Sequence, residues 1–105
     1  MYSNVSGATD VALLSPGNGV SNAKIIHITN THVSDAVLVD LYISVLSQRG
    51  VAASTYHILK SYPITVGGYF NLKSDILSFN NNSSTGFGLY IVLNNADSEV
   101  DVLIK

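Results

Sequence analysis

The stretch AVLVDLYISVL, residues 36–46, carries the most regular pattern in the chain. Apolar side chains recur at every second position, and Asp40, Tyr42 and Ser44 fall between them. Because successive side chains of a strand point to opposite faces, this alternation indicates a strand with one buried face. The side chains expected on the buried face are Val37, Val39, Leu41, Ile43 and Val45.

Two stretches near the end of the chain repeat the alternation. In EVDVLI, residues 99–104, Val100, Val102 and Ile104 share one face and Asp101 lies on the other. In GFGLYIVLN, residues 86–94, one face is fully apolar and the second is half apolar, with Tyr90 and Val92. Both stretches predict strands.

Weaker strand candidates fill the rest of the chain. They are residues 9–15, 23–30, 55–64 and 69–79, the last of which holds one or two short strands. Turn-forming residues separate the candidates at 15–19, 30–35, 66–68, 80–85 and 94–98. Helix signals are weak. The chain is therefore expected to be all-β, an antiparallel β-sandwich of about seven to eight strands with Greek-key or jelly-roll-like connections.

Turn chemistry is concentrated in SYPITVGGYFNL, residues 61–72. Pro63 has no N–H to donate to a neighbouring strand, so it suits an edge strand or a strand end. Gly67 and Gly68 permit the positive φ of a tight turn. We expect a corner at which the chain reverses or crosses between sheets. The residues expected to return to the core after it are Tyr69, Phe70 and Leu72.

Length and composition limit the functional classes. The 105 residues predict a single domain, 1–105, in which residues 1–20 form an N-terminal arm or a first strand. Only 11% of the residues are charged and the formal net charge is −2. A surface with so little charge repels other copies weakly, which favours life within an assembly.

Several kinds of partner and site are excluded by features that the sequence lacks. The five Lys and Arg residues are scattered, so we expect no nucleic-acid partner. No apolar run approaches the roughly 20 residues of a membrane span, so we expect no membrane partner. The chain has no cysteine, which excludes disulfides and thiolate zinc sites. The first residues lack the features of a signal peptide, and we expect synthesis in the cytoplasm.

Candidate chemistry is sparse. The histidines His27, His32 and His57 lack the mutual spacing that places two metal ligands on one face of a strand or helix. The serines lie in no nucleophile motif. The acidic side chains within residues 97–101 suit a solvated strand face better than a calcium site. We therefore expect no catalytic residue, no cofactor and no metal.

Tyrosines are the stronger signal. Tyr42 and Tyr90 fall on the less apolar faces of their strands, where an exposed ring can form a protein interface, a sugar platform or the rim of the core. The two-sided apolarity of residues 23–30 and 86–94 also favours a contact surface. The candidate interface residues are Ile25, Tyr42, Tyr62, Tyr69, Tyr90 and Val92.

Three stretches, in this order, resemble the small β-sandwich virion proteins of tailed bacteriophages. They are AKIIHITNTHVSDAVLVDLYI, TYHILKSYPITVGGYFNL and GFGLYIVLNNADSEVDVLI. The resemblance implies a virion component without enzyme activity or cofactor, made in the host cytoplasm and assembled in many copies. Its implied partners are itself, as a cyclic homo-oligomer, and another virion protein such as the major capsid protein.

Three functional hypotheses follow. The first is a capsid decoration, or cement, subunit that coats or stabilises the phage head. The second is a neck, tail or fibre module that binds a host glycan or receptor through Tyr42, Tyr90 and the Asn-rich loops 80–85 and 94–98. The third is a small hydrolase with a histidine-centred site, which no catalytic motif supports.

Overall fold

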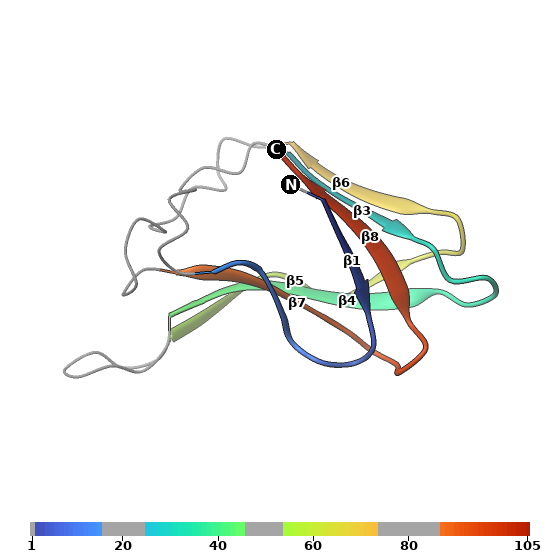
Figure 1. Cartoon of the computed structure of the whole chain (residues 1–105), viewed down its shortest axis with the longest axis horizontal. Helices are drawn as coiled ribbons and strands as arrows, with labels where there is room; N and C mark the ends of the chain where they lie inside the picture. The colour runs from blue at the N-terminus through green and yellow to red at the C-terminus, as the bar shows by residue number, and fades with distance from the viewer. Residues whose placement is uncertain (1, 16–24, 46–53, 74–86) are drawn as a thin grey trace.

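The computed structural model describes residues 2–15, 25–45, 54–73 and 87–105. These residues form eight strands in two four-stranded antiparallel sheets (Figure 1). The expected antiparallel β-sandwich is therefore confirmed. The strands are β1 (Tyr2–Ser6), β2 (Val11–Leu14), β3 (Ile25–Asn30), β4 (Val37–Val45), β5 (Ser54–Ile64), β6 (Tyr69–Lys73), β7 (Gly88–Leu93) and β8 (Glu99–Ile104).

The chain folds as one long hairpin wound into two layers. β1 pairs with β8, β2 with β7, β3 with β6 and β4 with β5, so the first half of the chain runs antiparallel to the second. Two further pairings, β3 with β8 and β4 with β7, join these pairs into sheets. The resulting orders, β1-β8-β3-β6 (the A sheet) and β2-β7-β4-β5 (the B sheet), are those of a jelly roll.

The core lies between the two sheets, where the alternation predicts it. In β4, Val37 and Val39 are fully buried, whereas Leu38 between them is exposed. Burying one such aliphatic side chain contributes about 1.5–3 kcal/mol, so the one-faced strands provide the main stabilisation. The core side chains of the last two strands are Leu89, Ile91, Leu93, Val100, Val102 and Ile104.

The described residues of the N-terminal region form two strands, β1 and β2. β1 pairs with β8 along its whole length, and β2 pairs with β7. Val5 is the one buried residue of β1, so this strand lacks the repeated apolar alternation by which a strand is recognised in a sequence. Residues 2–14 are thus built into the sandwich, while residues 16–20 lie outside the described residues.

The corner within residues 61–72 is a crossing between the sheets, because it joins β5 of the B sheet to β6 of the A sheet. The Gly68 N–H donates a hydrogen bond of 2.8 Å to the Thr65 carbonyl. Gly67 has a φ of 69°, as the third position of a type II turn requires. Gly68 does not have the expected positive φ; instead a Cβ there would lie 2.7 Å from Thr65 Oγ1, so close packing requires glycine.

One expectation for this corner is wrong. Tyr69 points away from the core with 66% of its surface exposed, whereas Phe70 and Leu72 are half-buried against the core. Tyr69 pairs with Thr29 on the outward face of the A sheet. Since side chains alternate along a strand, the inward position of Phe70 directs Tyr69 outward.

The other expected turns have two outcomes. Those at 30–35 and 94–98 are confirmed as connections between strands. The turn at 80–85, nearly all of the turn at 15–19 and the second half of the candidate strand 69–79 lie outside the described residues.

Candidate functional site

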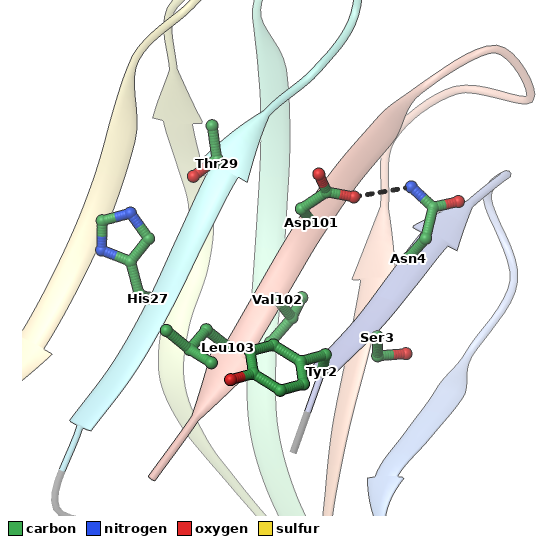
Figure 2. A pocket seen from close by; sticks show the side chains of 8 residues that line it. All are labelled: Tyr2, Ser3, Asn4, His27, Thr29, Asp101, Val102 and Leu103. Carbon is green, nitrogen blue, oxygen red and sulfur yellow. Dashed lines mark hydrogen bonds between the residues drawn. The ribbon is translucent and has the colours of Figure 1, made fainter.

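The outward face of the A sheet carries a groove of about 390 Å³ over β1, β8 and β3. We call it the outer groove. Figure 2 shows the side chains that line it: Tyr2, Ser3, Asn4, His27, Thr29, Asp101, Val102 and Leu103. Its volume is within the range of small-molecule sites.

The strand register builds the outer groove from two neighbouring rows of side chains. In one row, Tyr2 lies opposite Leu103, which lies opposite His27. In the next row, Asn4 lies opposite Asp101, which lies opposite Thr29. One long side of the groove is therefore aromatic or apolar, and the other is polar.

The polar row contains one hydrogen-bonded pair of side chains, and beside it lie oxygen atoms that can form further hydrogen bonds. Asn4 Nδ2 donates a hydrogen bond of 2.8 Å to Asp101 Oδ1 (Figure 2). Within the part of the chain that the structure describes, neither the second carboxylate oxygen of Asp101 nor the Thr29 hydroxyl has a side-chain partner. These oxygens can bind a ligand that carries hydroxyl groups.

Aromatic rings flank the outer groove. Tyr2 on the edge strand β1 is 82% exposed. On the opposite side, the His27 ring stacks on Tyr69, with centroids 5.0 Å apart and planes at 23°. A contact of 2.9 Å between His27 Nδ1 and Asn71 Nδ2 further orients the imidazole. The His27 ring is thus held by contacts with β6, and both flanking rings have apolar faces that a ligand can cover.

The outward face of the B sheet carries a second feature, which we call the aromatic row: Tyr90, Tyr42 and His57. The register places these residues directly opposite one another on β7, β4 and β5. Tyr42 stacks on Tyr90 at 5.5 Å and 19°, and its ring centroid lies 5.4 Å from that of His57. Such cross-strand aromatic pairs stabilise the sheet and present a broad ring surface.

Among the described residues of this face, Tyr42 has the most strongly shifted pKa. Burial, followed by the charge of Asp10 and a hydrogen bond to that carboxylate, raises the pKa of its hydroxyl to about 12. Beside the ring, Ser44 and Thr55 form a hydroxyl pair at 3.0 Å. These groups line a hollow of about 290 Å³ together with Tyr90.

The predicted interface residues divide between the two sheets. Tyr42, Tyr90 and Val92 lie together on the outward face of the B sheet. Tyr62 lies on β5 of the same sheet, but its ring meets Phe70 of the A sheet edge-on at 5.1 Å. The remaining two, Ile25 and Tyr69, belong to the A sheet, so the six do not form one surface.

The three isoleucines of β3 lie on opposite faces of the strand. Ile26 and Ile28 are fully buried in the core. The outward face of β3 carries the polar side chains of His27 and Thr29 at the outer groove. Ile25 shares this outward face with His27 and Thr29 and is half-buried.

The histidines do not converge. His27 lies on the A sheet, His57 on the B sheet, and His32 in the connection between β3 and β4. His32 Nδ1 accepts hydrogen bonds from the N–H groups of Ser34 and Asp35, at 3.1 and 3.0 Å, so it serves the local backbone. In the described residues, no group of three or more His, Cys, Asp or Glu side chains is arranged to hold a metal ion.

Two of the acidic side chains at 97–101 have local roles. Glu99 Oε1 accepts a hydrogen bond of 3.0 Å from the Thr31 hydroxyl, and Asp101 accepts one from Asn4. No helix in the described ranges is long and apolar enough to cross a membrane.

Sequence reasoning missed the outer groove. Tyr2 and Asn4 lie on β1, within residues 1–20, for which the sequence predicts an N-terminal arm or a first strand, and for Asp101 the sequence predicts a solvated strand face. Alternation of Tyr2 and Asn4 around Ser3 was the available signal, but a strand of five residues carries little periodicity.

No protein-family model matches the chain, and a search of curated proteins finds no match.

Proposed function

We propose that the chain is a non-enzymatic structural protein of a tailed-phage virion, a decoration subunit that coats or stabilises the head. The resemblance in the three long stretches supports this proposal. The eight-stranded jelly roll is compatible with it, since that architecture recurs in viral capsid and lectin domains. Fold alone does not decide function, so the proposal needs a surface that can make subunit contacts.

The aromatic row is the observation that carries the proposal. Tyr42 and Tyr90 form a stacked, half-buried pair on an outward sheet face, with Val92 beside them. Tyrosine is enriched at protein interfaces because its ring is apolar and its hydroxyl finds a hydrogen-bond partner. In the proposal, this face contacts a second copy of the chain, and the homo-oligomer docks on the major capsid protein.

Quantitative mass spectrometry of purified phage particles from the source lysate tests the location. A copy number equal to that of the major capsid protein, or a simple fraction of it, supports decoration of the head. A number set by the single tail contradicts decoration and supports a neck or fibre position. Absence from particles contradicts every virion role.

Light scattering of the purified chain tests the contact surface. We expect an oligomer that dissociates when Tyr90 is replaced by lysine, because a charge would then be buried at the contact. The matched control is Tyr2→Lys on the outward face of the A sheet, which should leave the oligomer intact. A monomer at high concentration, or equal dissociation by both variants, contradicts the assignment.

A second candidate function is a neck, tail or fibre module that binds a host glycan or receptor. The outer groove is the specific observation that favours it, because a groove with one aromatic side and one polar side suits a small ligand better than a flat protein contact. Binding of oligosaccharides by the purified chain tests this candidate.

A further inference from the structure

We propose that the outer groove is a binding site for a neutral saccharide of one or two rings. This proposal rests on the second candidate function, and it names the site and the class of ligand. The residues that carry the proposal are Tyr2, Asn4, His27, Thr29, Asp101 and Leu103.

The two rows of the groove match the two kinds of surface that a sugar ring has. The C–H face of a pyranose is apolar, and it packs on an aromatic or aliphatic surface such as the Tyr2 ring and Leu103. The hydroxyls around the ring edge require partners, which the second carboxylate oxygen of Asp101 and the Thr29 hydroxyl supply. Figure 2 shows the Tyr2 ring beside Leu103, with the polar side chains farther along the strands.

The dimensions of the groove agree with this ligand class. Tyr2 and His27 lie on strands separated by β8, a distance of two strand spacings, or about 10 Å. The groove volume is about 390 Å³, near the lower end of small-molecule sites. A site of this length accommodates a mono- or disaccharide rather than a long polymer.

The charge of the lining favours a neutral ligand. Asp101 supplies the one carboxylate, and the eight lining side chains include no lysine or arginine. An acidic sugar or a phosphate would meet the Asp101 charge without a cation to compensate it. A hydroxyl-rich neutral ligand instead forms charge-assisted hydrogen bonds to that carboxylate.

The backbone under the groove argues against a peptide strand. β8 and β3, which form the floor, are internal strands whose two edges both pair with neighbours. A peptide that binds by adding a strand needs an exposed sheet edge. The floor therefore recognises its ligand through side chains, as a saccharide site does.

Saturation-transfer NMR and titration calorimetry on the purified full chain test the proposal. The probes are lactose, cellobiose, maltose and diacetylchitobiose, with sialyllactose as an acidic counterpart. We expect at least one neutral probe to bind, and sialyllactose to bind more weakly than lactose.

Two groove variants and two matched controls locate the site. Tyr2→Ala removes the stacking surface, and Asp101→Asn removes the charge while keeping an oxygen that can accept from Asn4. We expect each to weaken binding about tenfold, the effect of losing one good contact. The controls are Tyr56→Ala, an exposed tyrosine of the B sheet at 59% exposure, and Asp97→Asn, an exposed acid of a connection. Both should bind like the unmodified chain.

Thermal unfolding of every variant checks that the fold is intact. Absence of binding by all probes at millimolar concentration, or equal weakening by the groove and control variants, overturns the proposal. Dissociation of an oligomer by Tyr2→Ala also overturns it, because a second copy would then cover the groove. The binding measurement does not depend on particle composition. If no saccharide binds, the proposal of head decoration still stands. If particle composition contradicts head decoration, the saccharide proposal is unaffected.

Discussion

Asp40 Oδ1 accepts a hydrogen bond of 2.6 Å from the backbone N–H of Ser61. The contact lies where two residues of β5, Lys60 and Ser61, oppose the single residue Asp40 of β4, which is a β-bulge. Lys60 Nζ approaches the other carboxylate oxygen at 3.2 Å. The Asp40 side chain of β4 thus supplies a hydrogen-bond partner for a backbone N–H at the β-bulge of the neighbouring edge strand β5.

Replacement of Asp40 by asparagine should destabilise the protein by about 1 kcal/mol at neutral pH, because an amide accepts the Ser61 N–H less strongly than a carboxylate does. The mostly exposed Lys60 contributes little to this difference. Urea unfolding measures the change. Asp97→Asn, which alters an exposed acid, is the control and should change the free energy of unfolding by much less.

The pH dependence of this difference follows from the pKa of Asp40. The Ser61 N–H, and then Lys60, hold that pKa below its ordinary value of 3.8, so the folded state favours the carboxylate. The stabilisation is fully present well above pH 3.8 and is lost as the pH falls through the lower folded pKa. The gap between the unmodified chain and Asp40→Asn should therefore close in acid. A gap that stays constant into that range would contradict the role of the charge.

Ser61 occupies the left-handed region, with a φ of 51°. A β-branched residue is strained there, so Ser61→Val should lower the free energy of unfolding by about 1–2 kcal/mol. Ser61→Gly should change it little, because relief of strain offsets the greater freedom of the unfolded chain. The control is Ser6→Val on β1, an exposed strand position without a positive φ. Equal effects of valine at both positions would count against backbone strain.

Asn30 is a buried polar residue, 2% exposed, that joins three parts of the backbone. Its Nδ2 donates to the carbonyls of Asp35 and Ile64 at 3.0 and 2.9 Å, and its Oδ1 accepts from the His32 N–H at 2.8 Å. Asn30→Ala should destabilise the fold by about 3 kcal/mol, since it leaves several of these groups unpaired.

Asn30→Asp removes the hydrogen-bond donations of this residue while keeping the size of its side chain. A carboxylate of the same shape still accepts from His32, but it cannot donate to the two carbonyls, so the loss at neutral pH should be at least as large as for alanine. Asn4→Ala, which removes one exposed side-chain hydrogen bond, is the control and should lower stability by less than about 1 kcal/mol. Tolerance of Asn30→Asp would show that these donations are unimportant.

Tyr42 should ionise late in an alkaline titration followed by ultraviolet absorbance. Burial and the nearby Asp10 charge raise its pKa from 10 to about 12. The folded state favours the neutral hydroxyl, so this stabilisation is complete below pH 10 and is lost as the pH rises toward about 12. Tyr42→Phe should abolish the late step, and Asp10→Asn should move it to lower pH. Persistence of the late step in Tyr42→Phe would assign it to another group.

The face of each regular strand was determined by the sequence itself. In residues 36–46 the direction of a side chain depends only on its place in the strand, so alternation indicates which residues reach the core. The same local rule located β7 and β8. It failed where the pattern is short, as in β1, or where an aromatic residue was assumed to be buried, as with Tyr69.

Strand order, and with it the outer groove, was decided by the tertiary structure. Asn4 and Asp101 lie 97 positions apart in the chain and are neighbours because β8 pairs with β1 on one edge and β3 on the other. Periodicity carries no information about which strands become neighbours, because that choice depends on how both layers close around one core. The sequence therefore determined the inward and outward faces, and the winding of the hairpin decided which outward side chains meet.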